Sequence, residues 1–114
     1  MHELSIAQSL VEIACDQAEQ AGAKRVTRVS VLVGLLSGVV PDSLSFCFPI
    51  VCQGTAAEGA ELAIQVDPAK GTCPKCGVSV ELNDFVLICP SCGAFPIEVR
   101  SGRDLKVTAL EVEE

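Results

Sequence analysis

The chain is predicted to fold as an α+β domain that is interrupted by a small cysteine-rich module. Segments with the apolar spacing of helices alternate with segments whose β-branched residues alternate as they do in strands. Four of the seven cysteines and three of the six prolines, in contrast, fall within residues 69–98. We therefore predict one α/β domain made of residues 1–68 and 99–114, and a separate module over residues 69–98.

Four elements of the α/β domain follow from simple periodicity. Helical spacing of apolar residues predicts a helix over 4–21, and Gly22 ends it because glycine favours helix termini. A strand over 25–34 is apolar on both faces, which predicts a central place in its sheet. Two further strands with alternating apolar residues are predicted over 60–67 and about 104–112.

A second helix is predicted over about 43–53. Asp42 is interpreted as its N-cap, because an aspartate side chain accepts hydrogen bonds from the free N–H groups of a first turn. Pro49 lies inside this helix and should kink or shorten it, since proline lacks an N–H. The apolar stripe of the helix consists of Leu44, Cys47, Phe48, Val51 and Cys52.

Composition excludes several classes of function. The chain has 114 residues, which is enough for one domain with a core, and 8 basic against 15 acidic side chains give a net charge of −7. This balance argues against a non-specific nucleic-acid binder and against attraction to an acidic membrane surface. The longest apolar stretch, 29–40, is too short to span a bilayer. The first residues lack the features of a signal peptide, so we expect a cytoplasmic protein.

The cysteine module has the ligand spacing of a zinc ribbon. Cys-Pro-Lys-Cys-Gly and Cys-Pro-Ser-Cys-Gly occur in sequence, with twelve residues between the second and third cysteines. Two residues between paired cysteines let both thiolates reach one ion, and the glycine lets the backbone turn beneath it. A hairpin turn at Asn83-Asp84 is predicted to bring the pairs together around one structural zinc. The predicted zinc ligands are Cys73, Cys76, Cys89 and Cys92.

Spacing alone leaves a redox dithiol and an iron–sulfur cluster open as alternatives at these cysteines. Catalysis is not predicted, because a zinc ion with four protein ligands has no open position. The single histidine stands at position 2, so no nucleophile–base pair is available and we predict that the chain is not an enzyme. The other cysteines, Cys15, Cys47 and Cys52, are predicted to be small buried apolar residues.

The N-terminus carries a second candidate metal site. The α-amine of Met1, the backbone nitrogen of His2 and the imidazole of His2 are close enough along the chain to bind one ion. An α-amine with a pKa of about 7.7–8.0 is a usable ligand near neutral pH. A deprotonated backbone nitrogen favours Ni(II) or Cu(II), which accept square-planar nitrogen sites. Glu3 adds a further backbone nitrogen and a carboxylate.

The combination of these motifs resembles the HypA/HybF family of nickel metallochaperones, which serve NiFe-hydrogenase maturation. The resemblance is carried by Met-His-Glu-Leu-Ser at the start, Ala-Lys-Arg-Val at 23–26, Gly-Leu-Leu-Ser at 34–37 and the two late cysteine pairs. It implies a three-stranded sheet with two helices packed on one face, and zinc in the module. It also implies nickel at the extreme N-terminus, with His2 as the key ligand and Met1 and Glu3 contributing.

The resemblance further implies partners. Family members hand nickel to the NiFe-hydrogenase large subunit together with the GTPase HypB, some also serve urease, and the family is not enzymatic. We expect a monomer or weak homodimer that binds neither nucleic acid nor membrane. Gly77 and Gly93 stand where several relatives have a histidine after a cysteine pair, so a thiolate-only zinc site is expected here.

Two further positions bear on the resemblance. Some relatives have an acidic residue near the nickel after the first strand, and the nearest one here is Asp42, which we interpret first as a helix N-cap. Pro49 replaces an acidic residue that is common in relatives. The alternative function is a zinc-ribbon interaction module or transcription adaptor without a labile metal, which would leave the Met-His-Glu start unexplained.

Overall fold

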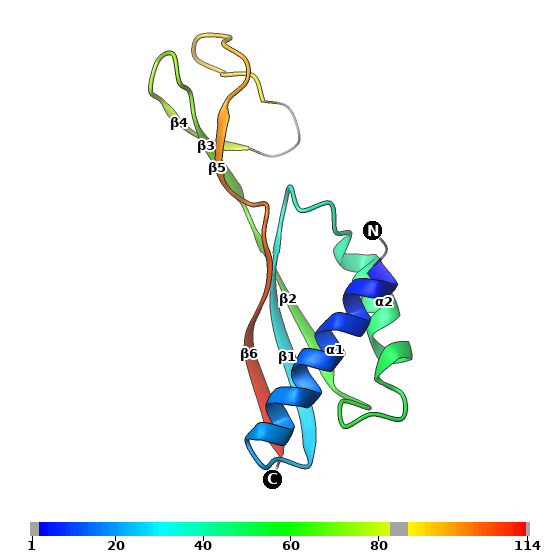
Figure 1. Cartoon of the computed structure of the whole chain (residues 1–114). Helices are drawn as coiled ribbons and strands as arrows, with labels where there is room; N and C mark the ends of the chain where they lie inside the picture. The colour runs from blue at the N-terminus through cyan, green and yellow to red at the C-terminus, as the bar shows by residue number, and fades with distance from the viewer. Residues whose placement is uncertain (1–2, 83–86, 114) are drawn as a thin grey trace. The chain divides into compact units, whose positions relative to one another are not determined.

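The structure is a computed structural model that describes residues 3–82 and 87–113 (Figure 1). It contains two helices and two three-stranded sheets, which confirms the predicted α+β fold. The chain divides into two compact units. The first comprises Met1–Val31, Val40–Gln65 and Lys106–Glu114, and the second comprises Leu32–Val39 and Val66–Leu105. Neither described helix is long and apolar enough to cross a membrane.

Helix α1 spans Glu3–Gln20, close to the predicted range. Its buried stripe recurs at helical spacing and packs against α2. The helix ends where Gly22 adopts a left-handed φ of 72°, so that the Ala23 N–H can donate to the Ala18 carbonyl at 2.9 Å. The buried residues of α1 are Ile6, Ala7, Leu10, Val11, Ala14 and Ala18.

The sheet beside these helices has the order β2-β1-β6, and its strands span Glu61–Asp67, Arg25–Gly34 and Leu105–Glu113 respectively (Figure 1). The central position of β1 confirms the prediction from its two apolar faces. The N–H groups of Lys24 and Gly34 donate to the carbonyls of Glu113 and Asp104, so β1 and β6 are antiparallel. Four valines of β1 are buried: Val26, Val29, Val31 and Val33.

Helix α2 spans Pro41–Cys52 and begins earlier than predicted. The interpretation of Asp42 as its N-cap is wrong: the N-cap residue is Val40, which has no side-chain cap, and Asp42 lies in the first turn. Pro41 explains the difference, because its fixed φ and missing N–H suit the first helical position. The helix continues through Pro49 to Cys52, and so is not shortened there. Leu44, Phe48 and Cys52 are buried at a spacing of one turn.

The second unit is built on the sheet β4-β3-β5, whose strands span Ser79–Leu82, Ala69–Thr72 and Glu98–Ser101. Strand β3 pairs antiparallel with both neighbours, with Ala69 opposite Leu82 and Thr72 opposite Ser79 in β4. The predicted turn at Asn83-Asp84 lies outside the described residues. The reversal that pairs β3 with β4 is made by the first cysteine turn, where the Cys73 N–H donates to the Val78 carbonyl at 2.9 Å.

The Gly-Leu-Leu-Ser loop contributes to the second unit. The Leu36 N–H donates to the Gly102 carbonyl at 2.7 Å, and the Leu36 side chain packs against the small core of this unit. A Cβ at Gly34 would overlap the Gly102 backbone, so only glycine fits there. This core contains five buried residues: Ala69, Cys73, Leu82, Cys89 and Ile97.

Candidate metal centres

Four cysteine sulfurs meet at the end of the second unit. The sulfurs of Cys73, Cys76, Cys89 and Cys92 all lie within 4.8 Å of one another. Two close pairs cross between the motifs: Cys73 to Cys92 at 3.6 Å and Cys76 to Cys89 at 3.7 Å. Over residues 3–82 and 87–113, no other group of three or more ligating side chains is close enough to share an ion.

These distances fit a tetrahedral zinc ion. Four sulfurs at about 2.3 Å from one zinc would lie about 3.8 Å from each other at tetrahedral angles. The two close pairs are therefore within about 0.2 Å of the spacing that the ion requires. Four thiolates leave no oxygen or nitrogen donor in the set, which suits zinc and disfavours harder ions such as magnesium.

The two cysteine turns have the same backbone geometry. In each, the N–H of the glycine donates to the carbonyl of the first cysteine, at 2.8 Å for Gly77 and 2.9 Å for Gly93. Both glycines have left-handed φ values, 77° and 75°, which a residue with a Cβ adopts only with strain. Equivalent backbone hydrogen bonds thus give both cysteine pairs the same turn conformation. The glycine after each pair, noted in the sequence, is a requirement of this turn.

Backbone hydrogen bonds favour the thiolate form of two of the four cysteines. The Cys76 N–H, 3.4 Å from the Cys73 sulfur, lowers the pKa of Cys73 to about 6. The Cys92 N–H lowers the pKa of Cys89 in the same way. Because the thiolate is the form that binds metal, these two buried thiols are prepared as ligands.

The cysteines outside this cluster have a different environment. Cys52 is buried in the first unit, and its burial, together with the Cys15 thiol, raises its pKa to about 11. A thiol with a raised pKa stays protonated and packs as a small apolar group. Cys15 and Cys47 are half-buried, so only Cys52 is as fully buried as predicted.

Of the predicted nickel ligands, only Glu3 belongs to the part of the chain that the structure describes. Met1 and His2 are outside the described residues, and Glu3 is the first residue of the helix. The Val40 N–H donates to the Glu3 carboxylate at 3.3 Å, so this side chain joins the beginning of α1 to the beginning of α2. This bond could not be predicted from local sequence pattern, because 37 residues separate its partners.

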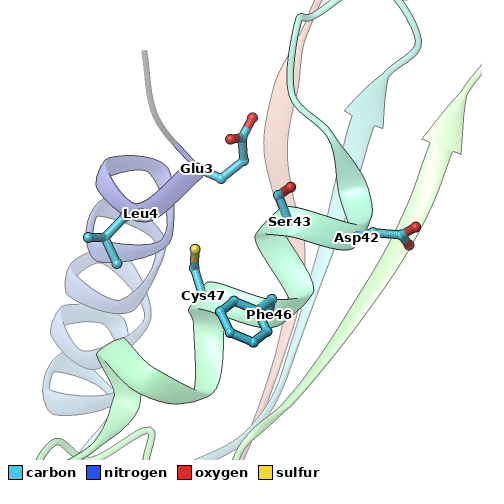
Figure 2. A pocket seen from close by; sticks show the side chains of 6 residues that line it. All are labelled: Glu3, Leu4, Asp42, Ser43, Phe46 and Cys47. Atoms are coloured by element: carbon cyan, nitrogen blue, oxygen red, sulfur yellow. The ribbon is translucent and has the colours of Figure 1, made fainter.

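A cavity of about 460 Å³ lies beside Glu3 (Figure 2). Figure 2 shows that it lies between the first turn of α1 and the first turns of α2. Asp42, the acid nearest to the loop after the first strand, lines this cavity together with Glu3. Sequence reasoning missed the cavity, because Leu4 and Cys47 fall on the predicted apolar stripes and were expected to be buried, while Phe46 lies outside them. It is lined by Glu3, Leu4, Asp42, Ser43, Phe46 and Cys47.

Comparison with known proteins decides the family. The family model described as "Hydrogenase/urease nickel incorporation, metallochaperone, hypA" matches residues 1–112. The chain belongs to the HypA family. Among HypA relatives, the hydrogenase maturation factor HypA of Geotalea uraniireducens is 47% identical over 99% of this chain and 100% of its own length. The corresponding factor of Chlorobaculum parvum is 42% identical over the same shares.

Solved HypA structures have the same fold. The solution structure of the Ni metallochaperone HypA from Helicobacter pylori aligns with a TM-score of 0.70 and 22% identity, over 99% of this chain and 98% of that one. A second solution structure of a HypA protein aligns with a TM-score of 0.69. Family membership confirms the resemblance seen in the sequence. HypA proteins are maturation factors and metallochaperones rather than catalysts, which argues against an enzyme here.

Proposed function

We propose that this chain binds Ni(II) at its N-terminus and delivers it during the maturation of a NiFe hydrogenase, with urease as a second client class. The single observation that supports this most strongly is the match of the HypA family model to residues 1–112, which include the Met-His-Glu start. In this proposal the cargo ligands are the Met1 amine, the His2 imidazole and backbone nitrogen, and Glu3.

The terminal donor set suits a cargo ion that must be released again. Amine, imidazole and backbone nitrogens favour nickel, and a chelate at a chain end can lose its donors one at a time. His2 is the only histidine in the chain, so no second imidazole competes for the ion. We propose that Glu3 contributes its backbone nitrogen, while its carboxylate keeps the hydrogen bond to Val40.

The four-cysteine cluster is proposed to hold a structural zinc. Cys73, Cys76, Cys89 and Cys92 would complete its coordination, and the ion would supply rigidity to a unit with a small core. A saturated site has no position for substrate, so this zinc would take no part in nickel transfer chemistry. We accordingly propose residues 69–98 as the zinc-binding ribbon, and residues 1–68 with 99–114 as the nickel-binding part.

Two protein partners complete the proposal. The nickel would pass to the hydrogenase large subunit, and the GTPase HypB would act with this chain in the transfer, which would take place in the cytoplasm. The relatives that carry the name hydrogenase maturation factor support this assignment. The chain's net charge of −7 disfavours nucleic acid as a partner.

Calorimetry with Ni(II) tests the nickel proposal directly. The zinc-loaded chain with its native N-terminus should bind one nickel ion, and His2→Gln should weaken this binding by at least about 100-fold, because the variant removes the imidazole ligand while a large residue at position 2 retains Met1. Elemental analysis should find the same zinc content in both proteins, which controls for folding. Equal nickel binding by both proteins, or by neither, would contradict the proposal and favour the zinc-ribbon adaptor.

The role of the Glu3 carboxylate is tested by two substitutions. Glu3→Gln keeps an oxygen that accepts the Val40 N–H, whereas Glu3→Ala removes it. We expect Glu3→Gln to bind nickel within about twofold of the native chain, and Glu3→Ala to bind about fivefold more weakly, the equivalent of one lost hydrogen bond. Calorimetry checks both values. Equal, large losses in the two variants would mean that the carboxylate is a nickel ligand instead.

A further inference from the structure

An exposed apolar surface lies next to the proposed nickel site. It consists of Leu4, Phe46, Cys47 and Ile50, which we call the helical patch. Phe46 is 72% exposed and Ile50 is 51% exposed. Leu4, Phe46 and Cys47 line the cavity of about 460 Å³ beside Glu3 (Figure 2). A phenylalanine with this exposure at the edge of a cavity is typical of a binding surface.

The helical patch arises because α2 is apolar on two sides. Leu44 and Phe48 are buried, one turn apart, and form the inner side of the helix. Phe46 and Ile50 are also one turn apart but face solvent, as their exposure shows. A helix that needs only one apolar face for its core gains nothing from the second one in isolation. The outer face of α2 therefore has the composition of a helix that a partner covers.

The charge of the two helices that carry the helical patch, with Glu3 and Asp42 lining its cavity, restricts what that partner can be. Neither α1 nor α2 contains a lysine or an arginine, while together they carry five acidic residues. A second copy of the chain on this surface would bring acidic helices against acidic helices, which is unfavourable. A partner with an apolar side chain surrounded by basic residues would match both the cavity and its charge. The acidic residues are Glu3, Glu12, Asp16, Glu19 and Asp42.

We propose that the GTPase partner docks on the helical patch through such a surface, with an apolar side chain in the cavity and lysine or arginine residues around it. This inference rests on the proposed function for the identity of the partner. Docking there would cover Glu3, which lines the cavity and directly follows His2 in the chain. The partner would thus contact the chain beside the nickel chelate, where release of the ion has to be controlled.

Two phenylalanine substitutions with equal exposure test the docking surface. Phe46 is 72% exposed in the first unit and Phe95 is 71% exposed in the second, so Phe95→Ser is a matched control for Phe46→Ser. The probe is the purified GTPase of the same organism, titrated by calorimetry. We expect Phe46→Ser to raise the Kd at least about tenfold and Phe95→Ser to change it less than about twofold.

Salt gives a second readout. Because the partner surface is basic, binding by the native chain should weaken in about 1 M salt, where charges are screened beyond about 3 Å. Both variants should keep the nickel and zinc contents of the native chain, which separates the docking proposal from the nickel proposal. Native affinity in Phe46→Ser, loss of binding only in Phe95→Ser, or no GTPase binding by the native chain would each overturn the docking proposal. Self-association that Phe46→Ser abolishes would assign the patch to a second copy and overturn it equally.

Discussion

Cys73→Ser should release the zinc and unfold the second unit, while the helices of the first unit persist. A serine hydroxyl stays protonated at neutral pH and is a poor zinc ligand, whereas the Cys73 thiol has its pKa lowered to about 6 and is ready to bind as thiolate. The substitution also leaves a polar group at a buried position. The three remaining thiolates would have to bind the ion without the fourth sulfur that completes its tetrahedral coordination.

The expected size of this effect follows from the small core of the second unit. Five residues form that core, and two of them, Cys73 and Cys89, are proposed zinc ligands. A core of this size does not normally support independent folding, and small modules rely on a metal or on disulfides. In comparable small modules, the apparent free energy of zinc binding that stabilises the fold is about 10–16 kcal/mol near neutral pH. Loss of the ion should therefore remove the stability of the unit altogether.

Zinc analysis and amide hydrogen exchange check this prediction. The native chain should contain about one zinc per molecule, and Cys73→Ser should contain much less and lose protection in β3, β4 and β5. Cys47→Ser is the matched control, because Cys47 is a half-buried cysteine outside the cluster. The prediction fails if Cys73→Ser retains stoichiometric zinc and protected amides, since the cluster would then be dispensable for the fold.

The first unit illustrates what local sequence pattern determines. The predicted ranges 4–21 and 25–34 lie within one residue of α1 and match β1, Arg25–Gly34. Both elements pack against one core, so the spacing of their apolar residues directly indicates whether the segment is a helix or a strand. The start of α2 was misplaced because two local signals compete there. Asp42 is a good N-cap and Pro41 is a good first helical residue, and the structure follows the proline.

Strand β3 shows the limit of local pattern. Its sequence, Ala-Lys-Gly-Thr, has little β-branched content, and no strand was predicted there. The strand exists because it lies between β4 and β5, and its glycine is required by that position. A Cβ at Gly71 would overlap the Ile97 side chain and the Glu98 carbonyl. Such a requirement comes from neighbours about 26 residues away in the chain, which local spacing does not register.

The candidate sites divide in the same way. Ligand spacing in the cysteine module predicted which four sulfurs meet, because each pair sits in one tight turn whose geometry the motif itself determines. The bond between Glu3 and Val40 and the helical patch depend on how α1 and α2 pack, so they became visible only in the structure. Phe46 falls outside the predicted stripe of α2, of which Leu44, Phe48 and Cys52 are buried in the structure. An exposed residue between buried ones has no periodic pattern that would single it out.

Acetylation of the Met1 α-amine should lower the nickel affinity of the chain by at least about 100-fold, because the amine is a proposed direct ligand. The acetyl group leaves His2 and Glu3 unchanged but converts the amine into an amide, which is no longer an amine ligand. An added residue would not serve here, because its own α-amine and the backbone nitrogens that follow it would form a new nickel chelate with the His2 imidazole. Calorimetry with Ni(II) measures the loss, and the chain with a free α-amine is the matched control.

The acetylated chain separates two forms of the nickel proposal that His2→Gln alone does not distinguish. If His2 bound nickel without the amine, the acetylated chain would keep its affinity, although His2→Gln would still lose it. If the amine is a ligand, the two changes should cause losses of similar size, because each removes one donor from the same chelate. The doubly changed chain should then be little worse than either single one, since a chelate already broken at one donor loses less from the second. Additive losses would contradict a shared chelate and place the two groups in separate sites.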